Sequence, residues 1–398
     1  MKRLSRRSGI LRKSPLHEFF NKKISLEAEG VQVINSGVGE PHNDTPEVIA
    51  NAGIEGIKNG NTRYTPVKGT MELRKQIKKN LKNEGLNYDI NSIVASAGAK
   101  PVINALLQIL VDPGVQVLVP APYYPPFVTV TEFIGAETVI VDTTKDDFQL
   151  TVERIEEAII NSHSAKRRIP RVIPKVLVLN TPNNPTGVVY TKDNLIKIAK
   201  LAEKYDLWVI SDESYYEFVY DSEFISPASL PGMKERTIIV RALSKGYAMT
   251  GWRIGYVVGP EEVIGKLSLY FENMNGCSSS VSQYAALEAL KNDDIPQVIR
   301  EEFLHNRKVV SNWLEGQKIP FVSPDGAFYF FADFSKIIKK LKLRNATELA
   351  EYILEKAEVA VTPGVSFGGQ YESYLRISYS IQREKLIEAI EKIDNIIY

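Results

Sequence analysis

The stretch Arg241–Tyr256, which reads RALSKGYAMTGWRIGY, decides how the rest of the chain is interpreted. An apolar run, Thr237–Val240, leads into it and another, Ile254–Val258, closes it, and both are typical of buried strands. Between these runs, Lys245 and Arg253 stand in a segment made largely of small, hydroxyl and aromatic residues. A lysine in such surroundings is costly to desolvate as an ammonium, so it should lose its proton or form a Schiff base. The arginine is a candidate fork for phosphate or carboxylate. An ordinary exposed loop explains both residues equally well on spacing alone.

The size and charge of the chain narrow the class of protein. Its 398 residues exceed one ordinary core, which favours two domains or one large α/β domain with an appendage. The net charge is +1, so no global field points to nucleic acid or to acidic partners. We therefore expect a small-molecule enzyme.

Targeting and metal signals are weak. Residues 1–13 are basic but have no apolar core behind them, which argues against a signal peptide and leaves a transit peptide as the less favoured alternative. No apolar run approaches the ~20 residues that a membrane helix needs. The single cysteine, Cys277, fits a reducing cytoplasm, and the four histidines show no metal-ligand spacing. We expect a cytoplasmic protein without a metal site.

Short apolar runs alternate with helical patterns over most of the chain, which is typical of a largely parallel sheet with helices on both faces. From about residue 290 the pattern changes to a long helical stretch, Pro296–Glu315, followed by an aromatic strand, Gly326–Phe331. We read this part as a smaller α+β domain. The predicted division is an N-terminal arm with part of the small domain in 1–45, a large domain in 46–285 and a small C-terminal domain in 286–398. The runs expected as strands before the opening stretch are Ile93–Ala97, Val115–Val119, Val139–Val141, Val176–Leu179 and Leu207–Ile210.

Polar residues follow several of these strands. Asn184 lies in TPNNPTG after one strand, Asp212 follows the next, and Lys245 follows a third. Because ligands of such sheets bind beyond the carboxyl ends of the strands, we expect these three side chains in one crevice. Gly98 and Ala99 join another strand to an apolar helix, and a helix N-terminus reached in this way is a ready anion site.

Four further positions are candidates for the site, and most of them also allow a purely structural interpretation. Gly39 lies in the tight sequence INSGVGEP, which suits close approach of a ligand or an ordinary turn. Tyr64 lies in a turn, where an exposed aromatic marks a contact surface. Tyr124 lies in a proline-stiffened loop, where it either stacks on a flat cofactor or packs in the corner. Arg376 lies inside the strand sequence YLRISY, as a salt-bridge residue or an anion-binding one.

The motifs TPNNPTG, SDESYYEF and LSKGYAMTGWRIGY, in this order, resemble those of class I/II pyridoxal-phosphate-dependent aminotransferases of fold type I. The resemblance runs from GVGEP near residue 37 to LRISYS near residue 375 and is strongest to the prokaryotic aspartate aminotransferases. It implies a mostly parallel seven-stranded sheet, with helices on both faces, as the large pyridoxal 5′-phosphate-binding domain, plus the smaller α+β domain. It also implies ping-pong transamination with 2-oxoglutarate, in a cytoplasmic homodimer with active sites at the subunit interface.

The resemblance also implies a role for each matched residue. Lys245 would carry the Schiff base to the cofactor and then move the proton from the substrate's Cα. Asp212 would keep the pyridine nitrogen protonated, and Asn184 and Tyr215 would hold the phenolic oxygen. Tyr124 would stack on the ring. The phosphate would be held by Gly98, Ala99, Ser244, Arg253 and, from the neighbouring subunit, Tyr64. Lys100 is also expected to contact the cofactor, and the substrate would be held by Gly39, Lys100, Asn184 and Arg376.

Three departures from the family pattern bear on function. Ala242 stands where the family often has a hydroxyl residue, and His42 where an acidic residue is common. No arginine occurs from 254 to 299, the region from which related enzymes read a distal carboxylate. Some members of the family bind the distal carboxylate with a lysine in a Gly-x-Lys sequence instead. Lys100 occupies that position in Gly98-Ala99-Lys100, which favours a dicarboxylic substrate.

Other functions remain as alternatives. The same cofactor and fold serve aromatic or broad-specificity aminotransferases, as well as β- and γ-elimination enzymes. The sequence motifs distinguish poorly between these aminotransferases and elimination enzymes. A nicotinamide-dependent oxidoreductase is disfavoured because no GxGxxG follows a predicted strand. A ligand-binding regulator is disfavoured because few residues precede the GVGEP motif.

Overall fold

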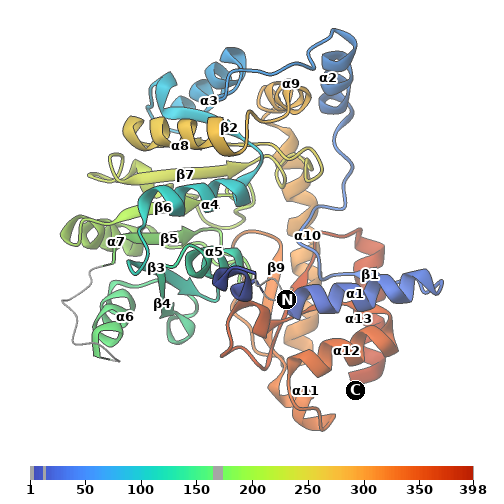
Figure 1. Cartoon of the computed structure of the whole chain (residues 1–398). Helices are drawn as coiled ribbons and strands as arrows, with labels where there is room; N and C mark the ends of the chain where they lie inside the picture. Colours follow the sequence, from blue (N-terminus) through green and yellow to red (C-terminus); the bar gives the residue numbers. More distant parts are fainter. Residues whose placement is uncertain (1–3, 12–14, 165–173, 398) are drawn as a thin grey trace.

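The computed structural model describes residues 4–11, 15–164 and 174–397 (Figure 1). Of the basic residues near the N-terminus, Lys2, Arg3, Arg12 and Lys13 lie outside the described residues. None of the described helices is long and apolar enough to cross a membrane.

The larger part of the molecule is built on a seven-stranded sheet with the order β2-β8-β7-β6-β5-β3-β4. Neighbouring strands are parallel except where β8 pairs with β2 and with β7. The segment from β7 to β8 contains no crossover helix, so the chain returns antiparallel. The strands are β2 (Ile93–Ser96), β3 (Gln116–Ala121), β4 (Glu137–Asp142), β5 (Val176–Asn180), β6 (Trp208–Asp212), β7 (Thr237–Ala242) and β8 (Gly255–Val258).

Helices cover both faces of this sheet, as the apolar runs predict. Val117 and Val119 of β3 pack into the core on one face, and Leu118 between them packs into the core on the other. The first face is covered by α4 (Ala99–Leu110), α5 (Pro126–Phe133) and α8 (Glu261–Met274). The second face is covered by α2 (Glu47–Lys58), α3 (Met71–Asn83), α6 (Val152–Ser164), α7 (Lys192–Lys204) and α9 (Ser280–Ala289).

The smaller part has its own antiparallel sheet with the order β11-β12-β9 and a separate two-stranded pairing of β1 with β10. Its core is rich in aromatic side chains, among them Phe303, Phe328 and Tyr379, and it includes Ile34 from the N-terminal segment. Its strands are β1 (Ile34–Asn35), β9 (Tyr329–Asp333), β10 (Val359–Ala360), β11 (Thr362–Pro363) and β12 (Tyr374–Ser378). Its helices are α1 (Pro15–Ala28), α10 (Ile295–Gly316), α11 (Ser335–Lys340), α12 (Ala346–Ala357) and α13 (Arg383–Ile397).

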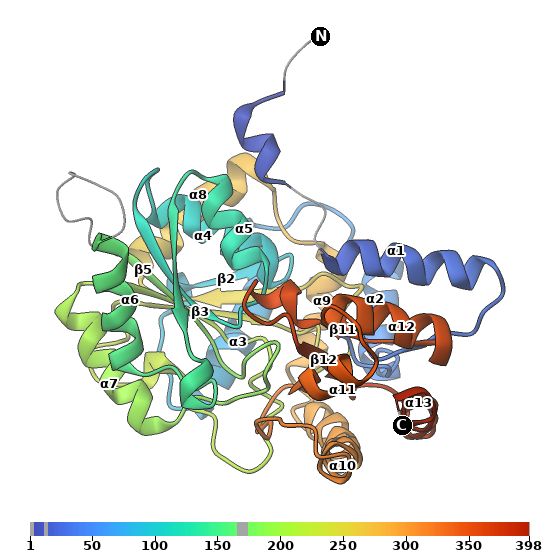
Figure 2. The ribbon, with the colours of Figure 1, turned by 90° about the horizontal axis from the view of Figure 1, so that it is seen from below.

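The two parts lie side by side, with the large sheet on one side and α11, α12 and α13 on the other (Figure 1). Seen from below, α1 runs along the smaller part (Figure 2), in agreement with its contacts to β11. The exact limits of the predicted domains, at residues 45 and 285, stay a prediction. Short 3-10 helices complete the structure at Arg6–Ile10, Ile90–Ser92, Thr144–Asp146, Pro227–Ser229 and Gly364–Phe367.

Candidate active site

A cavity of about 490 Å³ lies between the carboxyl edge of the large sheet and the smaller part. Thirteen residue positions were predicted for the site, and the cavity collects eleven of them from segments far apart in the sequence. Those that line it are Gly39, Ala99, Lys100, Tyr124, Asn184, Asp212, Tyr215, Ser244, Lys245, Arg253 and Arg376. Gly98, which directly precedes the lining residue Ala99, and Tyr64 are not among the lining residues. The chemical roles assigned to these residues stay predictions.

Lys245 follows β7 and reaches into the cavity. Its Nζ donates a hydrogen bond to the carbonyl of Gly39. Burial lowers the pKa of Lys245 to about 8, against the attraction of the Glu40 carboxylate. Roughly a tenth of the Lys245 side chains are therefore free amines at pH 7, far more than for an ordinary lysine, and the free amine is the form that a nucleophile requires.

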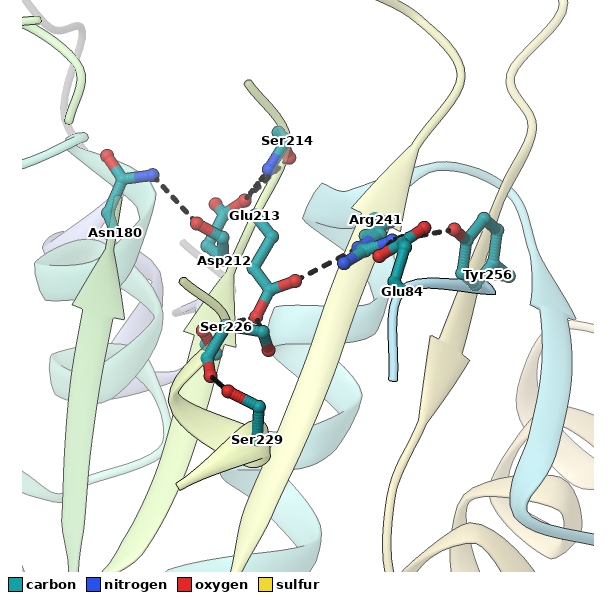
Figure 3. Close-up of polar contacts among 10 residues, drawn as sticks. Glu84, Asn180, Asp212, Glu213, Ser214, Ser226, Ser229, Arg241 and Tyr256 are labelled. Atoms are coloured by element: carbon teal, nitrogen blue, oxygen red, sulfur yellow. Dashed lines mark hydrogen bonds and ion pairs between the residues drawn. The ribbon is translucent and has the colours of Figure 1, made fainter. Parts of the chain in front are cut away.

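Asp212 ends β6 and is only 4% exposed. Burial raises the pKa of Asp212 to about 6, although Ser214 stabilises the carboxylate. The Ser214 amide and hydroxyl donate to Asp212 Oδ1 at 3.1 and 2.5 Å. Asn180 Nδ2 donates to the Asp212 carbonyl at 3.2 Å, which ties the ends of β5 and β6 together (Figure 3). The carboxylate is held in one orientation with its charge poorly solvated, so a cationic ring nitrogen would be a favourable partner.

An ion cluster built on the buried Glu213 and Arg241 lies next to Asp212 (Figure 3). Arg241 is 1% exposed, and its Nε lies 2.9 Å from Glu213 Oε2, while its Nη1 lies 2.8 Å from Glu84 Oε2. Ser211 and Ser226 donate to Glu213 Oε1 at 3.0 and 2.6 Å. Adjacent residues of a strand face opposite sides, so Asp212 faces the cavity while Glu213 anchors β6 to β7. Charged residues at the ends of apolar strands were the signal for this cluster, and the sequence interpretation did not use it.

An anion cradle lies where β2 gives way to α4. Gly98 has φ 85°, and a Cβ placed on it would lie 2.9 Å from Arg253 Nη2. The guanidinium is held by the carbonyls of Thr250 and Ala97 at 3.0 and 3.4 Å. The first N–H groups of a helix lack intrahelical partners, so the start of α4 and Arg253 together present donors and positive charge. A phosphate fits this cradle.

Arg376 lies on β12 at the opposite wall of the cavity. Its Nη1 donates to Asn184 Oδ1 at 2.8 Å and its Nη2 to the Gly37 carbonyl at 2.6 Å. Its buried Nε has no hydrogen-bond partner among the described residues. A buried guanidinium whose partners are neutral favours an added anion, so this wall suits a carboxylate.

Aromatic side chains line the wall between these two anion sites. Tyr215 and Tyr329 lie with their hydroxyl oxygens 2.7 Å apart, and the guanidinium carbon of Arg376 lies 4.4 Å from the Tyr329 ring centroid. On the other side, Lys100 Nζ lies 5.8 Å from the centroid of the Tyr124 ring. A flat cofactor is accommodated by such a wall.

Tyr64, a predicted site residue, and His42, a departure from the family pattern, are explained only by the wider structure. Tyr64 is 97% exposed and contributes nothing to the cavity of its own chain. His42, which the sequence left uninterpreted, has its Nε2 2.6 Å from Glu302 Oε1 on α10, and its amide donates to the Ser380 carbonyl at 2.9 Å. The His42 side chain thus fastens the segment that carries Gly39 to the smaller part.

The sequence interpretation missed several residues of the cavity. Tyr329 was seen only as part of an aromatic strand, and Glu40 only as part of a turn. Both line the cavity because the segment after β1 and the start of β9 come together there, a juxtaposition that local patterns do not reveal. The other missed lining residues are Gly37, Val38, Asn180, Ser214, Ala242 and Thr250.

Comparisons with known proteins agree with this arrangement over nearly the whole chain. The family model for aminotransferase class I and II matches residues 31–393. A probable aspartate/prephenate aminotransferase of Aquifex aeolicus is 40% identical, over 98% of this chain and 98% of the relative. The aspartate aminotransferase of Rhizobium meliloti is a similar solved structure, with a TM-score of 0.90 at 32% identity over 100% of this chain and 99% of that one. The Thermus thermophilus aspartate aminotransferase with maleate has a TM-score of 0.89 at 33% identity, covering 99% and 100%.

The protein is therefore a pyridoxal-phosphate-dependent transferase of fold type I. Within that fold type it belongs to the class I and II aminotransferases. The predicted family, fold class, enzyme class and cofactor are confirmed. The residues present fit the cofactor, because an amine, a buried carboxylate and an anion cradle converge on one cavity.

Proposed function

We propose that this aminotransferase takes the amino group of a dicarboxylic amino acid, L-aspartate first, and gives it to 2-oxoglutarate by a ping-pong mechanism. The observation that carries this proposal is Lys100, an exposed cation on the rim of a cavity whose inner wall already holds Arg376. Two cations facing one cavity suit a substrate with two carboxylates. The similar proteins described above, a probable aspartate/prephenate aminotransferase and an aspartate aminotransferase with maleate, support the same substrate class.

Each wall of the cavity would have one task. Pyridoxal phosphate, when bound, supplies an aldehyde that condenses with amines and a ring that withdraws electrons from the substrate. The cradle of Gly98, Ala99, Ser244 and Arg253 would hold its phosphate. Asp212 would hold the proton on the ring nitrogen, since a buried carboxylate gains most from a cationic partner.

The substrate would be oriented from the other wall. Arg376 and the Gly39 backbone would hold the α-carboxylate, and Asn184 would link this carboxylate site to the ring oxygen that Tyr215 also contacts. Lys245 Nζ, as a free amine, would take the proton from the substrate's Cα and deliver it to C4′ of the cofactor. Tyr124 would cover the ring and keep water from the reacting atoms.

The assembly and location are also proposals. The 97% exposure of Tyr64 on a turn supports a homodimer in which this ring completes the phosphate site of the neighbouring subunit. The single cysteine supports a cytoplasmic location.

The substrate class is tested with Lys100→Ala. We expect kcat/KM for aspartate to fall about 10- to 100-fold, the range of one hydrogen bond to a charged group, with kcat/KM for alanine almost unchanged. Lys82→Ala, an exposed lysine on α3, is the matched control. Equal losses for both amino acids would contradict the dicarboxylic proposal. Release of ammonia from aspartate without an acceptor acid would instead indicate elimination chemistry.

A further inference from the structure

The hydroxyl pair of Tyr215 and Tyr329 joins the two parts of the molecule inside the cavity. Tyr215 follows β6 of the large sheet, whereas Tyr329 begins β9 of the small sheet. Their hydroxyl oxygens are 2.7 Å apart, and both side chains are buried. Each hydroxyl has one hydrogen to donate, so within the pair one tyrosine is the donor and the other the acceptor.

The position of Tyr329 is rigidly determined. It pairs with Ser378 in the antiparallel ladder of β9 and β12, and its ring lies under the guanidinium of Arg376 on the same neighbouring strand. Its hydroxyl also occupies space that only a glycine leaves free, because a Cβ on Gly39 would lie 2.2 Å from it. Tyr329 therefore contacts the carboxylate wall and the Gly39 segment while its hydroxyl reaches Tyr215.

Both hydroxyls keep their protons at neutral pH. Burial raises the pKa of Tyr329 to about 12, although Arg376 opposes that rise, and burial raises the pKa of Tyr215 well above its usual value. The positive charge of Arg376 acts on both tyrosines, but its guanidinium carbon lies 4.4 Å from the centroid of the Tyr329 ring, which makes Tyr329 the better hydrogen-bond donor of the two.

We propose that Tyr329 is a positioning residue that donates to the Tyr215 hydroxyl and so directs the Tyr215 hydrogen into the cavity, toward the ring oxygen of the cofactor. The inference rests on the proposed role of Tyr215. If Tyr215 donated to Tyr329 instead, it would present only lone pairs to an oxygen that itself needs a donor. With Tyr329 as the donor, Tyr215 is both aimed and polarised.

The Tyr329 ring has a second, separable effect. The guanidinium carbon of Arg376 lies 4.4 Å from the centroid of the Tyr329 ring, and this cation–π contact helps to hold the guanidinium group in place. Removal of the hydroxyl alone leaves this contact intact, whereas removal of the ring loses it. The two consequences can therefore be measured on different variants.

The test is a pH titration of the absorbance of the enzyme reconstituted with pyridoxal 5′-phosphate. A hydrogen bond to the ring oxygen stabilises its deprotonated form, so Tyr215→Phe should raise the pKa of the bound chromophore by about one unit. Tyr329→Phe should raise it by part of that amount, and Tyr215→Phe with Tyr329→Phe should raise it no further than Tyr215→Phe alone.

The substrate kinetics give the second readout. Tyr329→Leu should raise KM for aspartate several-fold more than Tyr329→Phe does, because only Tyr329→Leu loses the ring under Arg376. If Tyr329 had a purely structural role, its substitutions would change the chromophore pKa and KM for aspartate together. Those changes would also be the same whether or not Tyr215 is present. Thermal unfolding of the reconstituted variants checks that each one folds.

The outcomes separate this inference from the proposed function. No spectral change in Tyr215→Phe would overturn the role of Tyr215, and the inference with it. A shift in Tyr215→Phe but none in Tyr329→Phe would overturn the inference alone. Full additivity in the double variant would show that Tyr329 acts independently of Tyr215, and would overturn it as well.

Discussion

At the scale of single residues, burial does most to shape the chemistry of the cavity. It lowers the pKa of the Lys245 amine and raises that of the Asp212 carboxyl, so both groups are held in states that are costly without a ligand. A cofactor that consumes the amine and supplies a cation to the carboxylate removes both costs. In the protein without cofactor, the cost of burying these two groups should therefore appear as a lower free energy of unfolding.

The first prediction concerns Lys245→Met in the protein without cofactor. Lys245 has a pKa of about 8 in the folded chain against a usual value of 10.5, so between these pH values the unfolded chain binds more protons and folding stability rises with pH. The variant should therefore be more stable than the original below pH 8, by at most about 3 kcal/mol, and this advantage should shrink as the pH approaches 10.5.

Urea unfolding of both apo proteins at pH 7 and pH 10 measures the difference, and Lys82→Met is the exposed control. A stability difference that is the same at both pH values would contradict the burial of the Lys245 charge. With cofactor added, the variant should stay folded but should lack the visible absorbance of the original.

At the scale of elements, the ends of strands and helices create the site. The sequence predicted which strand ends carry Asn184, Asp212 and Lys245, because short buried runs followed by polar residues are a local pattern. It did not predict that β8 is antiparallel or that Tyr329 of β9 lies opposite Tyr215. Those features depend on how distant segments pack, and the periodicity of one segment carries no information about its partner.

The junction of β2 with α4 gives the second prediction. Gly98 and Gly114 both have positive φ, 85° and 84°, so alanine at either position should cost about 1–3 kcal/mol in backbone strain. Only at Gly98 would the new methyl group meet Arg253, since nothing lies within 4 Å of a Cβ on Gly114. Fluorescence titration with pyridoxal phosphate should show affinity reduced about 10-fold for Gly98→Ala alone, a loss of about 1.4 kcal/mol. Equal affinities in the two variants would argue against a phosphate cradle at Gly98.

The contact between the N-terminal segment and α10 gives the third prediction. Glu302 Oε1 lies 2.6 Å from His42 Nε2, and Glu302 Oε2 accepts a hydrogen bond from Asn43 Nδ2 at 3.0 Å. These contacts hold the segment that carries Gly39. Glu302→Ala should raise KM for the amino donor about 5-fold, as expected for the loss of a partly exposed hydrogen-bonded contact worth about 1 kcal/mol. Glu301→Ala, its exposed neighbour on the same helix, should leave KM unchanged. If Glu302→Ala and Glu301→Ala had the same KM, the contact between Glu302 and the N-terminal segment would not position the substrate site.

At the scale of the whole molecule, two sheets meet at one cavity, and the second sheet was the harder to foresee. The parallel sheet and its covering helices follow from alternating apolar and amphipathic segments, which the sequence displays plainly. The smaller part instead combines residues from both ends of the chain, as the pairing of Ile34 with Val359 shows. Its contribution of Arg376 to the cavity was predicted through family resemblance, while that of Tyr329 and Glu40 was not predicted at all.

The fourth prediction concerns assembly. Because Tyr64 is 97% exposed in one chain, Tyr64→Ala should have no effect on a monomer. In the proposed homodimer it should weaken pyridoxal phosphate binding about 10-fold without lowering the thermal midpoint of the apo protein. Ile160→Ala, an exposed apolar residue on α6, serves as the control. Unchanged cofactor affinity, or a monomer in analytical ultracentrifugation, would contradict the proposed dimer site.

The central claim is transamination of a dicarboxylic amino acid at Lys245, and the half-reaction tests it most directly. The enzyme reconstituted with pyridoxal phosphate is mixed with single amino acids in the absence of an acceptor, and the absorbance is followed. We predict that aspartate removes the visible band with one equivalent of 2-oxo acid per subunit, that 2-oxoglutarate restores the band, and that alanine and phenylalanine react far more slowly. A band unaffected by aspartate, or ammonia released continuously without an acceptor, would contradict the account.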